Sequence, residues 1–273
     1  MEGIHKKKFL LYIDILGFQE LVNNHPEKVK MIYKIIDSLN VHQHHAFKTI
    51  VFSDTILVYN KNDPISKEDR RYLVMYACEF AQDLQHRLVG QGIYFRAHLV
   101  LGDFNHYNLE NTECFYGNAL IKAYLKEKNI QAFGLFIDNA CNADNRIFPT
   151  SKYDKDVSFV YINQSLERLQ RNTDGILPTD PYHFYATEEY WELIWDINQL
   201  KSIYRNMHTQ KNPKVRVKYI ATWQLFFNRY PKILSSLQAS GFSLRAICDK
   251  HDWSSDLEKY TSEVSYFRGM SNA

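Results

Sequence analysis

The chain has 273 residues, of which 45% are hydrophobic and 23% are charged, a composition ordinary for a folded protein. Lysine and arginine (33) nearly balance aspartate and glutamate (31), and the formal net charge is +2. A dedicated nucleic-acid-binding protein needs a concentrated basic face, so this balance argues against nucleic acid as a partner.

The cysteines and apolar segments indicate a cytoplasmic protein. The four cysteines are widely spaced, form no Cys-x-x-Cys pair and follow no secretory signal, so we expect free thiols in a reducing compartment. The apolar stretch Phe9–Phe18 is short and is interrupted by Asp14, so it predicts neither a signal peptide nor a membrane span. We therefore expect no membrane partner.

Strands and helices alternate in the first part of the chain. The apolar run over residues 9–16 predicts a strand buried on both faces, followed by helices over 18–22 and about 26–41. Strands are predicted over 49–52 and 55–59, and the short spacing between them indicates a tight hairpin. The later predictions are a long amphipathic helix over about 67–88, a strand over 93–101 ended by a turn at Gly102 and Asp103, a helix over 117–127, and strands over 134–137 and 157–162.

This order, β-α-α-β-β-α-β-α-β, begins with the ferredoxin-like β-α-β-β-α-β arrangement and has one extra helix in the first crossover. We therefore predict an α/β (α+β) fold built on a ferredoxin-like sheet. From about residue 188 the pattern is helical, and Pro213 divides it into two segments. Because no linker is evident, we predict a first domain over residues 1–165 and a mostly helical extension over 166–273 packed on it.

Two aspartates stand out as candidates for chemistry. Asp14 lies in the middle of an apolar strand, where a carboxylate without a partner costs several kcal/mol. Asp54 lies at the tip of the next hairpin, and in a β-α-β-β-α-β sheet this hairpin is the neighbour of the first strand. Two carboxylates that converge in this way suit Mg²⁺ or Mn²⁺, although a salt-bridged acid and a turn-forming aspartate explain each residue taken singly.

Four short segments follow one another along the predicted first domain. They are Tyr12–Phe18 (YIDILGF), Phe52–Thr55 (FSDT), Phe95–Asp103 (FRAHLVLGD) and Phe115–Ala119 (FYGNA). In this order they resemble the F-x-D-I-x-G-F, hairpin Gly-Asp, R-x-G-I-x-x-G and W/F-G-N/D-x-V segments of the class III nucleotidyl cyclases. The resemblance covers about residues 8–165 and implies that the first domain is a cyclase catalytic domain.

The resemblance implies a metal site and a subunit arrangement. In that family the residues matching Asp14 and Asp54 ligate two Mg²⁺ or Mn²⁺ ions per active site, and the carbonyl matching Ile15 helps to hold one of them. Class III sites form between two subunits, which implies a head-to-tail homodimer. The substrate implied is a nucleoside triphosphate, whose ribose 3′-hydroxyl attacks the α-phosphorus and displaces pyrophosphate.

The same resemblance names the expected substrate contacts. Arg96 is expected to reach the triphosphate, and Lys155 is expected to help stabilise the leaving pyrophosphate. The glycine matching Gly117 lets a helix approach the nucleotide in those cyclases, and we expect Phe18 and Asn118 to contact it as well.

Several positions depart from the family pattern. Purine cyclases read the base at two positions that are occupied here by Ile50 and Cys114, and Ile50 cannot hydrogen-bond a base edge. Their transition-state Asn and Arg fall on Ile121 and Leu125. Either catalysis is lost, or neighbouring lysines, with Lys122 the candidate catalytic residue and Lys126 beside it, supply the charge.

Two segments are similar to a narrower group. Gly117–Glu127 (GNALIKAYLKE) and the segment from Lys218–Tyr219 through Asn228 resemble the pyrimidine cyclases of bacterial Pycsar anti-phage defence. This resemblance implies a phosphorus–oxygen lyase that makes cyclic UMP, or alternatively cyclic CMP, and a separate effector protein that reads the product. It also explains the missing purine-reading residues.

Three alternatives stay open. One is a purine cyclase with unusual base contacts, and another is a degenerate cyclase fold that binds nucleotide as a sensor without turnover. A third is a relative of diguanylate cyclases or polymerase palm domains, although the sequence lacks the Gly-Gly-acid turn of the diguanylate enzymes.

Overall fold

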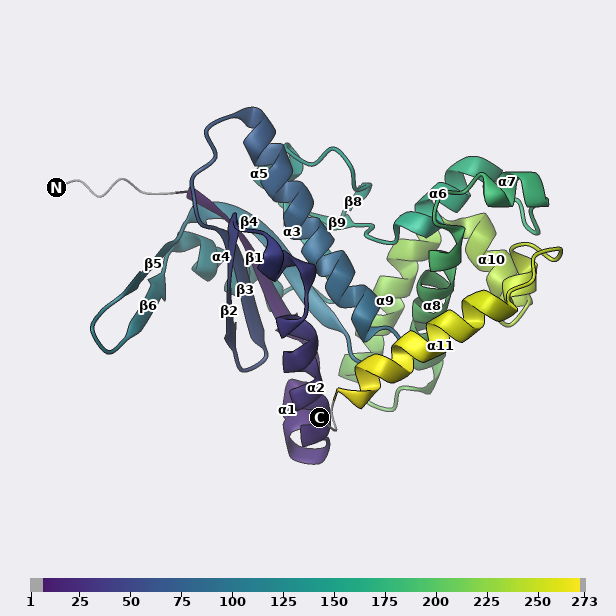
Figure 1. The fold of residues 1–273 in the computed structure, drawn as a ribbon, viewed down its shortest axis with the longest axis horizontal. Coiled ribbons are helices and arrows are strands. Elements are labelled where there is room, and N and C mark those ends of the chain that lie inside the picture. Colours follow the sequence, from purple (N-terminus) through teal and green to yellow (C-terminus); the bar gives the residue numbers. More distant parts are fainter. Residues whose placement is uncertain (1–6, 271–273) are drawn as a thin grey trace. The chain divides into compact units, whose positions relative to one another are not determined.

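The computed structural model describes residues 7–270, apart from the side chains of Val41 and Gln43. The chain divides into two compact units (Figure 1). The first unit contains the residues up to Gln85 together with Tyr94–Ile162, and the second contains His86–Ile93 together with the residues from Asn163 onward.

The first unit is built on a seven-stranded sheet in the order β2-β3-β1-β4-β7-β9-β8. Its strands are β1 (Lys7–Ile15), β2 (Phe47–Phe52), β3 (Thr55–Asn60), β4 (Phe95–Asp103), β7 (Gly134–Asp138), β8 (Thr150–Lys152) and β9 (Val157–Val160). β1 is antiparallel to both of its neighbours, β3 and β4, and β4 is parallel to β7. The order β2-β3-β1-β4 is the ferredoxin-like arrangement, so this part of the sequence prediction is confirmed.

Helices cover both faces of this sheet. They are α1 (Phe18–Asn24), α2 (Pro26–Asp37), the 3₁₀ helix η1 (Asn40–Gln43), α3 (Lys67–Leu88), α4 (Asn118–Glu127) and the short α5 (Asn139–Asn142). Ala119 and Ala123 of α4 belong to the same buried cluster as Leu10 and Tyr12 of β1. Successive strand residues point to opposite faces, so Phe9 lies on the other face, where the guanidinium of Arg70 in α3 is 5.3 Å from its ring centroid.

The structure differs from the sequence prediction at several places in this unit. Gly102 and Asp103 do not form a turn but are the last residues of β4, because pairing with Lys8 and Lys7 of β1 continues through them. The helix expected to reach residue 41 ends at Asp37. A two-stranded hairpin, β5 (Asn105–Asn108) and β6 (Glu113–Tyr116), was not predicted and extends away from the main sheet (Figure 1).

The second unit is helical. It contains α6 (Gln164–Thr173), α7 (Pro181–Tyr185), η2 (Tyr190–Glu192), α8 (Leu193–Thr209), α9 (Pro213–Arg229), α10 (Pro231–Ala239), η3 (Leu244–Ala246) and α11 (Ser254–Gly269). The predicted break at Pro213 is confirmed, since α9 begins there and the first helical position needs no backbone N–H donor. Across residues 7–270 no helix is long and apolar enough to cross a membrane.

A buried carboxyl group is expected to make the second unit sensitive to pH. Asp196 of α8 accepts hydrogen bonds from Asn163 Nδ2 at 2.6 Å and from the backbone N–H of Leu166 at 3.0 Å. Burial raises the pKa of Asp196 from 3.8 to about 7. The unfolded chain therefore gives up this proton at lower pH than the folded chain, and the stabilisation present below pH 3.8 is lost as pH rises to about 7.

We expect the melting temperature to fall between about pH 4 and pH 7, and to fall less in Asp196→Asn, whose side chain cannot ionise. Thermal denaturation at a series of pH values measures both slopes. Asp249→Asn, which changes an exposed carboxylate of the same unit, is the matched control and should retain the wild-type slope. Equal slopes in wild type and Asp196→Asn would contradict the assignment.

Candidate functional site

The register of the central strands brings Asp14 and Asp54 to the same end of the sheet. Asp14 is paired with Thr55 in the β1–β3 ladder, and the backbone N–H of Ile15 donates to the carbonyl of Asp54 at 3.0 Å. Burial raises the pKa of the Tyr12 phenol, and the negative charges of Asp14 and Asp54 raise it further. The strand register thus places Asp14 and Asp54 side by side at the end of β1, where the predicted topology puts them.

Two aromatic residues support the tip of the β2–β3 hairpin. The hydroxyl of Tyr33 in α2 donates to the carbonyl of Ser53 at 3.0 Å, and Ser53 adopts a left-handed conformation with φ +55°. The ring of Phe18, at the start of α1, lies 6.3 Å from the ring of Tyr33. Phe18, predicted to contact the nucleotide, is buried and supports the residue that holds this tip.

The donors at this end of the sheet fit a divalent cation that is bound together with a phosphate. In the described part of the chain no three His, Cys, Asp or Glu side chains are clustered to hold a metal ion. Two carboxylates and a backbone carbonyl at Ile15 are hard oxygen donors of the kind that Mg²⁺ and Mn²⁺ select. Mg²⁺ usually completes its shell with waters and substrate phosphates, so this donor set suits an ion that arrives with a nucleoside triphosphate.

Arg96 lies beside Asp14 and is almost enclosed. The two residues are paired in the β1–β4 ladder, and Arg96 Nη2 is 3.5 Å from Asp14 Oδ2. The guanidinium also contacts the carboxylate of Glu127 and donates from Nη1 to the carbonyl of Ile130 at 2.6 Å. Burial lowers the pKa of Arg96, and the charge of Asp14 opposes this effect. The residue expected to reach the triphosphate is 7% exposed and lies between two carboxylates.

The expected nucleotide contacts lie around the start of α4. Ile50 is 9% exposed and belongs to an apolar cluster with Leu10, Tyr12 and Ala119. Gly117 precedes α4 with φ +154°, and a Cβ atom there would lie 2.1 Å from the carbonyl oxygen of Asp103. The α4 helix can therefore approach β4 this closely only with glycine at the position.

Cys114 and Asn118 flank that glycine. Cys114 lies on β6, where it is paired with Tyr107, and is partly exposed. Asn118 is exposed as the first residue of α4.

Lys122, on α4, and Lys155, in the loop before β9, both lie near the end of β7. Lys122 Nζ donates to Asp138 Oδ2 at 2.6 Å. Lys155 is exposed, and its backbone carbonyl accepts a hydrogen bond from Asn139 Nδ2 at 3.0 Å. Lys122 lines a pocket of about 520 Å³ between α4 and the ends of β7 and β9, whose walls also include His98, Lys126 and Asp138.

His98 forms the buried wall of this pocket. No hydrogen bond of standard geometry reaches either ring nitrogen of His98 within the described residues, although the nearby backbone of Ala123 raises the pKa of the ring slightly; burial is the larger effect and lowers this pKa to about 4. A neutral imidazole in this position has a polar ring nitrogen that water or a ligand in the pocket can reach.

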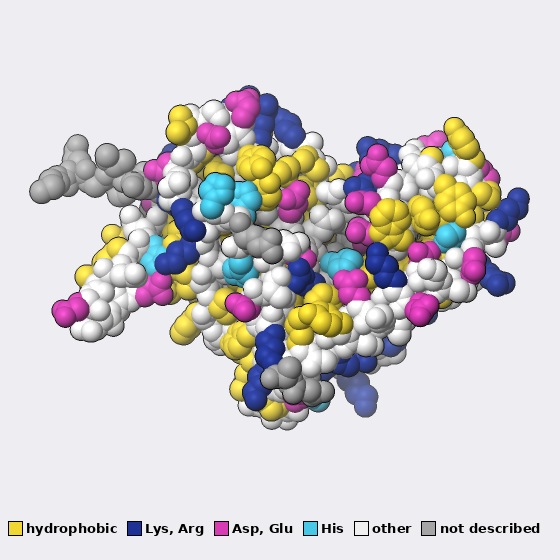
Figure 2. Space-filling model, in the orientation of Figure 1, with side chains coloured by type: hydrophobic (Ala, Val, Ile, Leu, Met, Phe, Trp, Pro, Cys, Tyr) yellow, Lys and Arg dark blue, Asp and Glu magenta, His cyan; other side chains and the backbone are white. Residues whose placement is uncertain are grey.

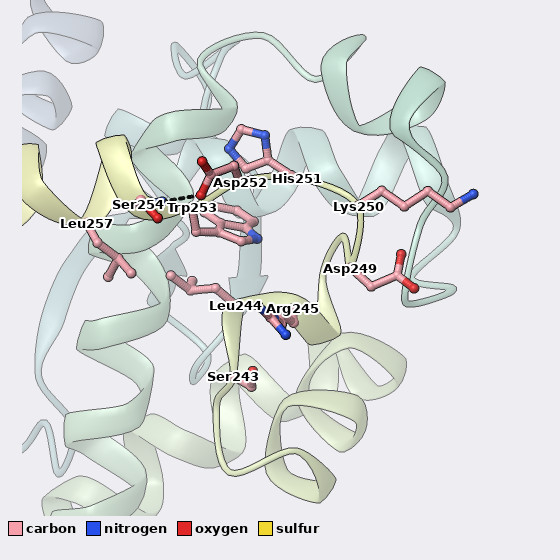
Figure 3. Close-up of a pocket in the computed structure, with 10 residues that line it drawn as sticks. All are labelled: Ser243, Leu244, Arg245, Asp249, Lys250, His251, Asp252, Trp253, Ser254 and Leu257. Carbon is pink, nitrogen blue, oxygen red and sulfur yellow. Dashed lines mark hydrogen bonds between the residues drawn. The ribbon is translucent and has the colours of Figure 1, made fainter.

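A second pocket, of about 540 Å³, lies within the helical unit between η3 and the start of α11 (Figure 3). Asp252 accepts a hydrogen bond from the backbone N–H of Ser254 at 3.1 Å, and Figure 3 shows Lys250 extending away from Trp253. This pocket contains none of the residues that the sequence predicted for a site. Lys, Arg, Asp and Glu side chains are interspersed over the face shown in Figure 2.

No known protein family and no curated protein sequence matches this chain. Among solved structures, the adenylyl cyclase CyaB from P. aeruginosa is 12% identical over 57% of this chain and 94% of its own, with a TM-score of 0.42. The guanylyl cyclase Cya2 is 18% identical over 59% of this chain and 93% of its own, with a TM-score of 0.40. A bacterial light-regulated adenylyl cyclase is 14% identical over 57% and 91%, with a TM-score of 0.43.

These neighbours are adenylyl and guanylyl cyclases.

Proposed function

We propose that this chain is a divalent-metal-dependent nucleotidyl cyclase that converts a pyrimidine nucleoside triphosphate, UTP or CTP, to a 3′,5′-cyclic nucleotide and pyrophosphate. The observation that carries the proposal is the convergence of Asp14 and Asp54 at the end of the central strands, with the backbone N–H of Ile15 bonded to the carbonyl of Asp54. A ferredoxin-like sheet that presents two such carboxylates has the oxygen donors that phosphoryl transfer requires.

In the reaction, a bond forms between the ribose O3′ and the α-phosphorus while the bond between that phosphorus and the bridging oxygen of pyrophosphate breaks. The proton of the 3′-hydroxyl leaves to water. Bound Mg²⁺ or Mn²⁺ would supply Lewis-acid stabilisation of the nucleophile and of the phosphate charge. Asp14, Asp54 and the carbonyl of Ile15 would hold the two ions. The start of α4 at Gly117 and Asn118 would lie against the nucleotide, while Lys122 and Lys155 would counter charge on the leaving pyrophosphate.

We further propose a homodimer with sites at the subunit interface. Ile121, Tyr124 and Leu125 of α4 are 57%, 44% and 55% exposed, an unusual exposure for apolar side chains on neighbouring turns of one helix. A second copy of the chain would cover this face. The proposal places Lys122 and Lys126, on the same helix, near the partner's metal carboxylates, where they would replace the Asn and Arg that other class III cyclases use.

Two features support a pyrimidine base. Ile50 lies in an apolar cluster and offers no hydrogen bond to a purine edge, and Cys114 is a weak donor. Gly117–Glu127 also resembles the Pycsar pyrimidine cyclases, and on this ground we propose that the product is a second messenger in anti-phage defence, read by a separate effector protein.

The test is purified protein incubated with Mn²⁺ and each of ATP, GTP, CTP and UTP, with the products resolved by chromatography. We expect cyclic UMP or cyclic CMP, and no product once EDTA has removed the metal. Cyclic AMP or cyclic GMP as the main product would favour a purine cyclase instead.

The second candidate function is a nucleotide sensor without turnover, favoured by Ile121 and Leu125 at the positions of the transition-state residues. A sensor would bind a nucleoside triphosphate in the presence of EDTA and form no cyclic product.

A further inference from the structure

Glu127 forms an ion pair with Arg96, and Arg96 in turn lies beside Asp14 of the proposed metal site. Ala119, Ala123 and Glu127 are the buried residues of α4 and are spaced four apart, so they form the face of the helix that meets the sheet. The two alanines let α4 approach closely, and its last turn then brings the Glu127 carboxylate onto the Arg96 guanidinium.

These three charged side chains are largely shielded from water. The side chains of Arg96, Glu127 and Asp14 are 8%, 7% and 20% exposed. Charges in such an environment are screened weakly, so each strongly affects the others. One guanidinium between two carboxylates leaves a net negative charge, which favours a cation at the more exposed member, Asp14.

Without Glu127 the balance of charge around Arg96 would change. Within the described residues, Asp14 would be the carboxylate left to form an ion pair with Arg96. A buried guanidinium with one carboxylate partner neutralises that partner and competes with any other cation for its oxygens.

We propose that Glu127 is a positioning residue of the metal site: it holds the Arg96 guanidinium and offsets its charge, which keeps the Asp14 carboxylate available to Mg²⁺ or Mn²⁺. The inference rests on the proposed function, because only there is Asp14 a metal ligand. In this arrangement Arg96, through its ion pair with Glu127, holds the end of α4 against β1 and β4.

The experiment titrates Mn²⁺ into the full chain and follows free Mn²⁺ by electron paramagnetic resonance. We expect Glu127→Gln to raise the dissociation constant of Mn²⁺ about 10-fold, the effect of roughly one close charge in a weakly screened site. Glu110→Gln, which removes an exposed carboxylate from the β5–β6 turn, is the matched control and should bind Mn²⁺ as wild type does.

A double variant separates this role from a purely structural one. Arg96→Met combined with Glu127→Gln removes the buried cation as well, and we expect it to bind Mn²⁺ at least as tightly as wild type. If Glu127 only holds α4 in place, the double variant will bind no better than Glu127→Gln, and the proposal is overturned. Should Glu127→Gln not fold, the double variant and Glu127→Asp, which keeps the charge, carry the test: 10-fold weaker binding by both would overturn it.

Asp14→Asn tells the two proposals apart. One possible result is that wild type and Glu127→Gln bind Mn²⁺ equally well and Asp14→Asn does not bind it. The proposed role of Glu127 is then wrong, and the proposed metal site is supported. If wild type binds no Mn²⁺ and forms no cyclic nucleotide, both proposals are overturned.

Discussion

Asp54→Asn is expected to reduce the rate of cyclic-nucleotide formation by about 10³-fold or more, because a neutral amide oxygen binds a divalent cation far more weakly than a carboxylate does. The variant keeps the size of the side chain. It also keeps the backbone carbonyl that accepts the hydrogen bond from Ile15, so the hairpin should retain its place beside β1. The melting temperature is therefore expected to change little.

The measurement is the initial rate with saturating UTP or CTP over a series of Mn²⁺ concentrations. Asp37→Asn removes an exposed carboxylate at the end of α2 and is the control for an unspecific effect of charge. We expect Asp14→Asn to lose activity to a similar degree. Near-normal rates in Asp54→Asn at high Mn²⁺ would show that its carboxylate is not part of the catalytic site.

The ferredoxin-like part of the sheet could be predicted because its signals are local. The run over residues 9–16 is apolar enough to require a strand buried on both faces, and the long helix α3 occupies the predicted range, Lys67–Leu88. The meeting of Asp14 and Asp54 followed from topology alone, since neighbouring strands in this arrangement fix which loop ends lie together.

The β5–β6 hairpin could not be found in the same way, because long-range contacts hold it rather than an alternating pattern. Its strands carry the sequences NHYN and ECFY, which are only four residues long and show no alternation of polar and apolar residues. The Tyr59 hydroxyl contacts His106, and His106 Nε2 lies 2.6 Å from Glu113 Oε1. A sequence pattern does not contain such pairings across strands.

The contacts that surround the candidate site could not be predicted from the sequence either. Arg96 was expected at the triphosphate, and in the structure it is buried and paired with Glu127, 31 positions later in the chain. One signal was present: Glu127 continues the four-residue spacing of Ala119 and Ala123, which places an acid on the buried face of a helix. Tyr33 and Asp138 gave no comparable signal, because their contacts with Ser53 and Lys122 join separate elements.

Gly117→Ala is expected to displace the start of α4 and to lower both stability and activity. The added Cβ would lie 2.1 Å from the oxygen and 2.8 Å from the carbon of the Asp103 carbonyl, and these backbone atoms of β4 cannot rotate away. The φ of +154° adds strain for any residue with a side chain. We expect a loss of about 3 kcal/mol, which corresponds to a melting temperature lower by roughly 6–12 °C.

Gly17→Ala separates the clash from the backbone strain. Gly17 also has a positive φ, +73°, but a Cβ there would meet no atom within 4 Å. That variant should lose only the left-handed strain, about 1–2 kcal/mol. Thermal denaturation of the two variants gives the comparison, and similar melting temperatures would contradict the close approach of α4 to β4. If α4 does contribute to a nucleotide site, Gly117→Ala should also lower the rate of cyclic-nucleotide formation by about 100-fold, because small displacements of positioned groups reduce phosphoryl transfer steeply.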